Sequence, residues 1–557
     1  MKIKKIRYVA AAAVLVVAAA VTVSAVNPDF KQAKNLEILF NLFREITTNY
    51  VDEKDPDLLM RKAAEGMLTG FDPYTEFLSE NDMEAFELMT TGRYGGIGAV
   101  IRKDGDYVEI MEPYEGFAAD KAGLKPGDKI LYIDGKDMKN AESSTVSALM
   151  KGDPGSYFKL TVERFSDGSV VEHNIRRERV SIPGVPYYGM INDSVGYILH
   201  DSFTEDCSTD IRNAVVAMKK AGMKQLVYDV RNNGGGILPE AVKIVSIFVP
   251  KNSVVVSMKG RAAEVDITYK TTTEPVDTSM NIVVLINNAS ASAAEIVAGA
   301  LQDMDRAVVV GQRSFGKGLV QSPRPLGYNT YVKLTTAKYY IPSGRCIQVI
   351  DYSYTNEDGS VGAIPDSLIR EFHTLKYGRK VYDGGGIVPD VKLPSEVLSF
   401  FTISLYAEGF LDEFALEYVK ARNFEPVDEK TFRLTEQEYS SFVDFMADKD
   451  VDMGSETKLL LDKLEKASGG EVYAEAISPQ IAAIREKIDR SRDAELLAKR
   501  GEITRLLENM IIKYFHYSQG VIIHNLIQDE SIVEAVKVAQ DTSRYMEIIT
   551  TVDTSRN

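Results

Sequence analysis

The sequence has little of the two residues on which most metal and thiol chemistry depends. Only two cysteines and five histidines occur in 557 residues. The histidines fall in no metal-ligand spacing and in no serine-hydrolase motif, so we expect no metal site. Cys207 and Cys346 have unrelated surroundings and are predicted to be free thiols. Cys207 has no evident base beside it, which argues against a catalytic thiol. No cofactor is predicted.

Positive charge is also in short supply. The chain has 65 basic against 81 acidic residues, a net charge of −16, and its basic runs are short and mixed, as in Arg176-Arg177-Glu178-Arg179. Nucleic-acid binding needs clustered Lys and Arg, so we expect no nucleic-acid partner. The glycine-rich turn at 234–236 could suit a phosphate, but no Gly-Lys-Ser/Thr follows it. Nucleotide binding is therefore not expected.

The amino terminus has the pattern of an export signal. Four positive charges precede an apolar run of 19 residues from Tyr8 to Val26. Two alternatives stay open: a signal peptide cleaved near Val23-Ser24-Ala25, or an uncleaved anchor almost long enough to span a bilayer. No cysteine lies nearby for lipid attachment. Both alternatives predict an exported chain in the periplasm or cell envelope, and the second holds it at the inner membrane.

Five regions are predicted along the chain, beginning with the leader at 1–26. Residues 27–91 have helical apolar spacing and form either a packing arm or a dimerising arm, the latter giving a homodimer. Residues 92–180 are rich in short strands, and residues 181–395 alternate strands with helices, which predicts an α/β core. Residues 396–557 are helical and charged, with a helix predicted to begin at Ser478-Pro479. We expect that last region to pack or oligomerise, with recruitment of substrate as the alternative.

A glycine-rich segment opens the second folded region. Tyr94, Gly95, Gly96, Ile97 and Gly98 precede a predicted strand, where exposed backbone N–H groups could hold a chain-terminal carboxylate while the peptide tail pairs with the strand edge. An ordinary hairpin loop is the alternative. Residues 118–130, a short helix, a turn and a strand, resemble part of a PDZ domain.

Ser292 and Lys317 are the candidate catalytic pair. Ser292 stands at a predicted strand-to-helix turn, and Lys317 follows 25 positions later between two glycines. A serine hydroxyl needs a base, and lysine can serve only when neutral. Lowering its pKa from about 10.4 to between 7 and 8 costs roughly 4 kcal/mol, which burial has to supply. Gln321 could return to Lys317 if the loop is helical, and it could orient the amine without adding charge.

A tetrahedral intermediate also needs N–H donors aimed at its oxyanion. The amide of Ala293, directly after Ser292 at a helix amino terminus, is one candidate. Gly235 and Gly236 are candidates for a second donor, because a glycine turn lets the backbone approach the substrate closely.

Taken together, four motifs resemble those of the carboxyl-terminal processing, or tail-specific, peptidases. That resemblance covers about residues 36 to 393 and implies a serine endopeptidase whose core is related to the Clp-protease and crotonase group. It implies Ser292 as nucleophile, Lys317 as general base, Gln321 as its positioner, and protein or peptide substrates with accessible carboxyl termini. Ala294 and Gly234 depart from the family pattern without removing a catalytic group. A non-catalytic envelope scaffold or chaperone is the alternative function. The motifs are Asp229–Gly236, Ser290–Ile296, Phe315–Gln321 and Ala337–Arg345.

Overall fold

The computed structural model describes residues 28–352, 361–395, 398–447, 449, 456–489 and 492–551. The predicted export segment lies outside these residues. No helix among the residues described has the length and apolar character needed to cross a membrane. The chain divides into two compact units: one ends at Glu80 and includes Pro323–Leu334, and the other holds Asn81–Ser322 and the chain from Thr335 onward.

The first unit contains the predicted helical arm as far as Glu80, and the last residues of the predicted arm, 81–91, belong to the second unit. Asp55 caps the second of its helices by accepting the Asp57 amide at 2.9 Å, and Pro56 occupies that helix's first turn. Apolar side chains such as Phe30, Leu36 and Phe40 remain exposed on the first. A short strand after the helices pairs with residues 331–333 of a later hairpin. The elements are α2 (Pro28–Asn49), α3 (Pro56–Leu68) and β1 (Glu76–Leu78).

The PDZ-like region is an antiparallel sheet with two short helices. Its strand order is β3-β4-β5-β7-β8, with β6 beside β5, so β3 is an edge strand. β2 pairs with β9 and so joins the entry and exit of the region. The elements are α4 (Met83–Thr91), β2 (Arg93–Gly96), β3 (Ala99–Asp104), β4 (Tyr107–Pro113), α5 (Ala118–Lys121), β5 (Lys129–Ile133), β6 (Lys136–Asp137), α6 (Ser143–Met150), β7 (Tyr157–Glu163), β8 (Val170–Arg176) and β9 (Glu178–Ser181).

The α/β core is built on a second sheet, of order β10-β11-β12-β15-β16-β21. Its neighbours pair in parallel except for β10 with β11. The predicted alternation of strands and helices is confirmed. The elements are β10 (Tyr187–Met190), β11 (Val195–Leu199), α7 (Cys207–Lys220), β12 (Gln225–Asp229), α8 (Leu238–Val245), β15 (Asn281–Ile286), α9 (Ala293–Asp303), β16 (Val308–Gly311) and β21 (Val391–Lys392).

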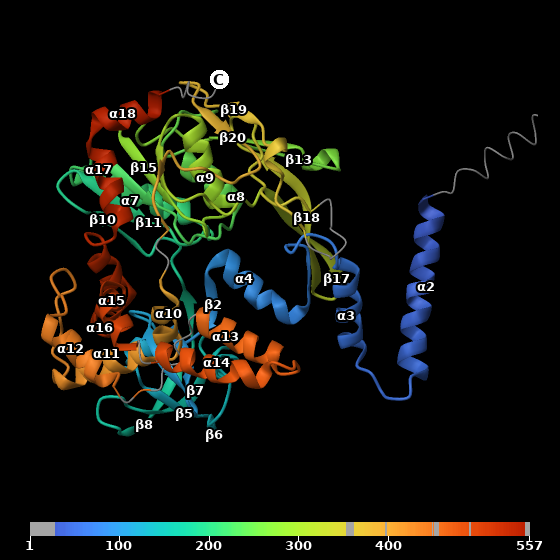
Figure 1. Cartoon of the computed structure of the whole chain (residues 1–557). Helices are drawn as coiled ribbons and strands as arrows, with labels where there is room; N and C mark the ends of the chain where they lie inside the picture. Colours follow the sequence, from blue (N-terminus) through green and yellow to red (C-terminus); the bar gives the residue numbers. More distant parts are fainter. Residues whose placement is uncertain are drawn as a thin grey trace, which may run out of the picture. The chain divides into compact units, whose positions relative to one another are not determined.

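Helices cover both faces of this core sheet. Alternate strand residues such as Tyr228 and Val284 pack against α7, α8 and α9. The residues between them, such as Val227 and Val283, pack against α17 (Glu530–Gln540) and α18 (Thr542–Thr550). Figure 1 shows these two helices, in red, beside β15. The region predicted as a carboxyl-terminal extension therefore supplies one layer of the core.

Antiparallel hairpins extend the core beyond the central sheet. β13 pairs with β14 and β18, and β18 also pairs with β17, while β19 and β20 form a separate pair. The elements are β13 (Val254–Gly260), η2 (Ala263–Val265), β14 (Ile267–Lys270), β17 (Leu319–Gly327), β18 (Thr330–Tyr340), η3 (Asp366–Leu368), β19 (Glu371–His373) and β20 (Lys380–Tyr382).

Most of the remaining helices enclose another apolar cluster, which includes Leu411, Phe442 and Leu507, while α13 and α14 pack against each other. The prediction that Ser478-Pro479 begins a helix is wrong. Pro479 lies inside α14, because Ala474, Glu475 and Ala476 are strong helix formers that extend the helix backward. The elements are α10 (Phe400–Ala407), α11 (Phe410–Ala421), α12 (Glu436–Phe445), α13 (Glu456–Ser468), α14 (Ala474–Asp489), α15 (Arg492–Ala498) and α16 (Arg500–Asn525).

α16 connects the helical region to both other regions of the second unit. The helix breaks at Tyr517, where φ is 54° and ψ is −163°. The amide of Ser518 beyond the break donates to Glu112 of β4 at 2.7 Å, and the Tyr517 hydroxyl contacts Asp120 at 3.1 Å. After the break the chain runs into α17 on the core sheet. The segment around this break thus contacts the PDZ-like region, and the second half of α16 leads onto the core.

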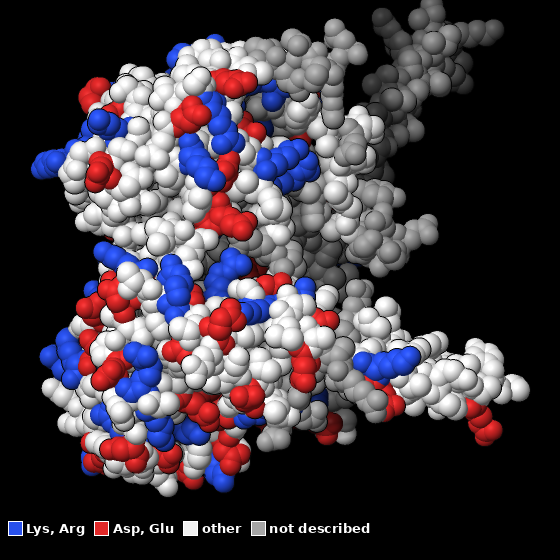
Figure 2. Space-filling view, turned by 60° about the vertical axis from the view of Figure 1, so that its left-hand side comes forward, with Lys and Arg blue, Asp and Glu red and all other residues white. Residues whose placement is uncertain are grey.

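Basic and acidic side chains are interspersed on the face of the molecule that Figure 2 shows. This distribution agrees with the mixed basic runs of the sequence, and it produces no broad field of one sign on that face.

We predict that Arg345→Met destabilises the core. The Arg345 guanidinium and the Asp303 carboxylate at the end of α9 are both buried, with a shortest separation of 2.9 Å. Removing one partner of a buried pair costs about 3 to 5 kcal/mol, because the other charge is left uncompensated. Urea denaturation followed by circular dichroism should show a lower midpoint. Arg500→Met, which breaks an exposed pair with Glu436, should leave the midpoint unchanged. Equal midpoints for both variants would contradict the prediction.

Candidate active site

Ser292 occupies a strained turn between β15 and α9. Its φ of 55° and ψ of −115° are unusual for a residue with a side chain, and Ser292 is half-buried at the amino-terminal cap of α9. The preceding turn is fixed by the Ala291 amide, which donates to the Asn233 carbonyl oxygen at 2.9 Å. The hydroxyl therefore stands at the carboxyl end of a central parallel strand, where α/β folds commonly place their sites.

A buried carboxylate, that of Glu295, connects this turn to the lysine loop. It accepts the amides of Ser292 at 2.8 Å, Gly316 at 2.7 Å and Lys317 at 2.9 Å, and the hydroxyl of Ser314 at 2.5 Å. Burial raises the pKa of the Glu295 carboxyl to about 7, while these four donors oppose the rise. The backbones of the two predicted catalytic residues are thus held by one side chain.

Lys317 is half-buried in the loop that precedes β17. The next amide, of Gly318, donates to Gln348 Oε1 at 2.7 Å. The buried Tyr339 hydroxyl contacts the carbonyl oxygens of both Lys317 and Ser292, the latter at 3.3 Å. The structure therefore brings the Ser292 and Lys317 segments together, as the sequence predicted.

The expected route from Gln321 to Lys317 is wrong. Gln321 lies in strand β17 and not in a helix, so a one-turn return to Lys317 does not occur. The sequence Leu319-Val320-Gln321 pairs instead with β18, and the Gln321 side-chain nitrogen donates to Thr335 Oγ1 at 3.0 Å. This contact fixes the orientation of the amide from the neighbouring strand.

The glycine turn lies directly beside Ser292. A Cβ on Gly235 would be 2.8 Å from the Ser292 Cβ and 3.0 Å from the Ala293 nitrogen, and the φ of Gly235 is +98°. The close approach and the positive φ both therefore require glycine at position 235. The Gly235 amide donates to Asn233 Oδ1 at 2.8 Å, whereas Gly236 forms a parallel bridge with Phe203. The glycine turn that was predicted to supply an oxyanion donor thus lies beside Ser292, with the Gly235 amide bonded to Asn233.

The predicted tail-binding segment forms β2 and the turn before the edge strand β3. Gly98, at a φ of +72°, lies so close to Phe117 that a Cβ would be 2.6 Å from the Phe117 Cβ. Burial raises the pKa of the Tyr94 phenol to about 12, and the nearby backbone of Gly98 and Ala99 opposes that rise. The Tyr94 oxygen therefore lies near this turn. Gly95, Gly96 and Ile97 lie between them in the chain.

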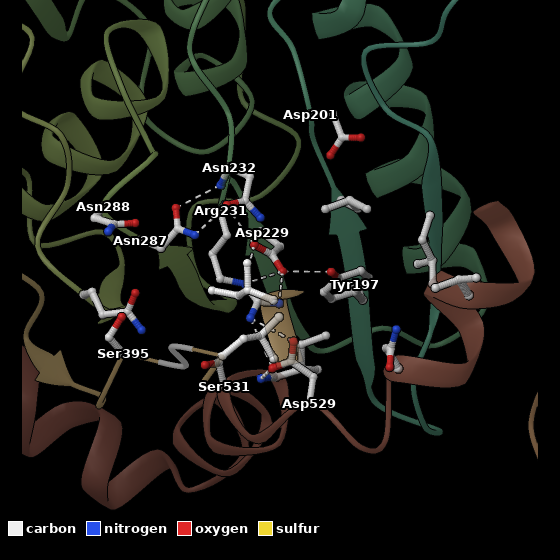
Figure 3. A pocket seen from close by; sticks show the side chains of 18 residues that line it. Tyr197, Asp201, Asp229, Arg231, Asn232, Asn287, Asn288, Ser395, Asp529 and Ser531 are labelled. Carbon is white, nitrogen blue, oxygen red and sulfur yellow. Dashed lines mark hydrogen bonds and ion pairs between the residues drawn. The ribbon is translucent and has the colours of Figure 1, made fainter. Parts of the chain in front are cut away.

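A cavity of about 700 Å³ opens near the carboxyl ends of β11, β12 and β15. Figure 3 shows Asn232 and Asn287 bonded to each other on one side, and Arg231 between Asp229 and Asp529 at the centre. A second cavity, of about 780 Å³, lies between the PDZ-like region, the core and α16. Both are lined by Asp201 and Ile522, so the two cavities adjoin.

Sequence reasoning gave no role to Glu295 or Tyr339. Ser292 and Glu295 have the spacing of a capping box, a serine followed three residues later by glutamate, which could have revealed the carboxylate. Tyr339 gave no such signal, because its contacts depend on how two distant loops approach β18. The two cysteines are unpaired as predicted, and burial raises the pKa of the Cys207 thiol to about 12, which agrees with an unreactive side chain.

Comparison with known proteins agrees with this arrangement. A model of peptidase family S41 matches residues 194–355, a PDZ domain model matches 109–164, and a model described as "Probable PDZ-protease, C-terminal helical domain" matches 401–539. A carboxy-terminal-processing protease of Bartonella bacilliformis is 32% identical over 376 residues, which are 67% of this chain and 82% of that protein. The chain belongs to peptidase family S41. The multidomain α/β fold predicted for this S41 chain is confirmed.

Other relatives of this S41 chain match it over a smaller share of their length. A probable CtpA-like serine protease of Staphylococcus aureus is 34% identical over 315 residues, 56% of this chain and 62% of that protein. The chain thus spans less than two thirds of that relative. A solved structure titled "Photosystem II D1 C-terminal processing protease" is 26% identical and matches 64% of this chain and 87% of its own, with a TM-score of 0.35.

We predict that Glu295 makes the stability of this S41 chain depend on pH near neutrality. The pKa of Glu295 rises from 4.5 in the unfolded chain to about 7 when folded, so the wild type gains stability as the pH falls from about 7 to 4.5. The gain amounts to about 3 kcal/mol, at about 1.36 kcal/mol per pH unit. Glu295→Gln should lack this gain when urea unfolding is compared at pH 5 and pH 8.

A second variant tests the same carboxylate without removing it. Ser314→Ala deletes the hydroxyl that most strongly opposes the raised pKa of Glu295, so the gain in stability should begin at a higher pH than in the wild type. An identical pH dependence in wild type, Glu295→Gln and Ser314→Ala would show that Glu295 does not titrate near neutrality.

Proposed function

We propose that the chain is an exported serine endopeptidase that uses Ser292 as nucleophile and Lys317 as general base. The observation that carries this proposal is the shared carboxylate of Glu295, which binds the amides of both residues. A nucleophile and its base must be held within hydrogen-bonding reach, and fixing both backbones from one buried group serves that requirement. Membership of family S41 supports the same assignment.

The chemistry follows from these roles. The Ser292 hydroxyl oxygen attacks the carbonyl carbon of the scissile peptide bond while the neutral Lys317 amine takes its proton. The ammonium then protonates the leaving amine, and water releases the acyl group from Ser292 by the reverse sequence. The first donor to the oxyanion is the amide of Ala293, at the start of α9, where the helix dipole also favours negative charge. The second donor is an amide of the glycine turn at 235–236.

Gln321 acts as the positioner of Lys317 in this proposal. The Gln321 side-chain nitrogen donates to Thr335 Oγ1, so the side-chain oxygen is left to accept a hydrogen bond from the Lys317 amine. Because the contact comes from strand β18 and not from a helical turn, the orientation depends on the hairpin of β17 and β18. The glutamine carries no charge and therefore does not favour the ammonium form.

Substrate tails bind the PDZ-like region in the same proposal. The edge strand β3 offers unpaired backbone groups to an extended peptide, and the amides of Gly98 and Ala99 offer donors to its terminal carboxylate in place of the Tyr94 oxygen. The two adjoining cavities lead from this region toward Asn287 and Asn288, a few residues before Ser292. The bond that is cut then lies near the captured terminus.

The sequence of residues 1–26 supports export, with a cleaved signal peptide and an uncleaved inner-membrane anchor as the two alternatives. In the periplasm or cell envelope, the site is exposed to other exported proteins. Its proposed substrates are those proteins or peptides whose carboxyl termini are accessible.

We predict that Ser292→Ala and Lys317→Ala each abolish cleavage of an unfolded, tailed substrate while melting temperature stays unchanged. Each variant removes one of the two groups that move the proton. Lys224→Ala provides a matched lysine control, because Lys224 is exposed at the opposite end of β12. Retained cleavage in Ser292→Ala or in Lys317→Ala would rule out the proposed dyad.

A fluorophosphonate probe separates the enzyme from the alternative scaffold or chaperone. The wild type and Lys224→Ala should be labelled, and Ser292→Ala should not. A protein that binds tailed peptides but leaves the probe unreacted would be a scaffold that uses the same PDZ-like region without chemistry.

We also predict that tail binding depends on a free carboxylate. In the Ser292→Ala background, a fluorescent peptide with a free carboxyl terminus should bind at least about tenfold more tightly than its amidated twin, because charge-assisted bonds contribute about 1.5 to 3 kcal/mol. Tyr94→Phe removes the competing hydroxyl and should tighten binding of the free acid only. Tyr132→Phe, an exposed tyrosine on β5, is the control. Fluorescence anisotropy measures each affinity, and equal affinities for the two peptides would rule out carboxylate capture.

A further inference from the structure

Arg231, at the entrance of the glycine turn, is held between the carboxylate of Asp229, two residues before it, and that of Asp529, near the carboxyl terminus. Its guanidinium contacts Asp229 at 2.6 Å and Asp529 at 2.9 Å (Figure 3). Asp229 is almost fully buried and also accepts the Tyr197 hydroxyl at 2.8 Å. Asp529 belongs to the loop between α16 and α17. One side chain therefore joins the carboxyl-terminal helices to the turn beside Ser292.

Movement of Arg231 would be transmitted to the site through a short series of bonds. The next residue, Asn232, exchanges hydrogen bonds with Asn287 at 2.9 and 2.8 Å. Asn233 accepts the Ala291 amide through its carbonyl and the Gly235 amide through its side chain. The contacts with Asn287 and Ala291 tie the glycine turn to the segment that carries Ser292, and the Gly235 contact braces the turn itself. Fixing the glycine turn at Arg231 therefore also fixes its position relative to Ser292.

Asp529 is itself fixed by the helix that it begins. Its Oδ1 accepts the Ile532 amide at 2.9 Å and so caps α17, whose apolar side chains pack on the core sheet. An asparagine would cap the helix equally well, because the cap needs only an oxygen acceptor. The negative charge of Asp529 has a separate use, which is the two-pronged contact from Arg231 Nη1 to both carboxylate oxygens, at 3.1 and 2.9 Å.

We propose that Asp529 is a positioning residue for the glycine turn, acting through Arg231, so that the carboxyl-terminal helical region completes the oxyanion site of the core. This inference rests on the proposed serine peptidase function and extends it. The helical region then serves the chemistry directly, by setting the distance between the turn and Ser292. Family membership assigns no such role to these helices.

The test compares two aspartates that cap neighbouring helices. Asp529→Asn keeps the cap of α17 and removes the charge that binds Arg231. Asp541→Asn makes the same change at the cap of α18, where the exposed aspartate accepts only the Arg544 amide, at 3.0 Å. We expect Asp529→Asn to lower kcat and the fluorophosphonate labelling rate by about tenfold or more, with KM and tail affinity within about twofold, since small displacements of a catalytic group cost up to about 100-fold. Asp541→Asn should resemble the wild type.

Two further variants separate positioning from mere stabilisation. Arg231→Lys keeps the charge and loses the planar fork, and it should lower kcat in the same direction as Asp529→Asn. The double variant Arg231→Lys with Asp529→Asn should lower kcat no further than the more affected of the two single variants, because both single changes break the same contact. A loss of kcat in the double variant equal to the product of the two separate losses, or unchanged kcat in Asp529→Asn, would overturn the proposal. If the wild type itself is not labelled while its tail binding is intact, the proposed function fails and not this inference.

Discussion

The buried carboxylate of Glu295 is the interaction on which the arrangement of the site depends. A carboxyl group with no solvent access is costly to ionise, and four donors around it compensate for that cost. Two of these donors are the amides of Ser292 and Lys317, which come from different connections of the α/β core. Because both of these amides donate to a side chain and not to the backbone of a strand or helix, the carboxylate takes the place of secondary structure for them. Tyr339 adds a second link from β18.

The core sheet sets where these loops can meet. Its parallel strands direct the turns after β12 and β15 to one edge, so the glycine turn and the Ser292 turn are neighbours although more than fifty residues separate them in the chain. The edge also carries Arg231, which is neutralised from the core side by Asp229 and from the helical region by Asp529. Helices from the carboxyl-terminal region therefore take part in the site as well as in the packing of the sheet.

The sequence predicted what local pattern and spacing control. β15 contains an unbroken apolar run from Ile282 to Ile286, and such a buried strand is recognised by its own side chains. Gln321 and Pro479 were misjudged for the opposite reason: pairing with β18 decided the first, and the preceding residues Ala474–Ala476 decided the second. The roles of Tyr339 and Asp529 could not be foreseen, because each depends on contacts across long stretches of chain. The role of Glu295 could have been predicted from its capping-box spacing with Ser292.

The position of α17 along the chain has a consequence for biosynthesis. As a nascent chain emerges from its amino terminus, all strands of the core sheet are made before this helix. Until then Val227, Val283 and Leu285 have nothing to cover them on that face of the sheet, and Arg231 has only Asp229 as a partner. The turn beside Ser292 therefore lacks one of its two carboxylate supports until nearly the whole polypeptide has been made.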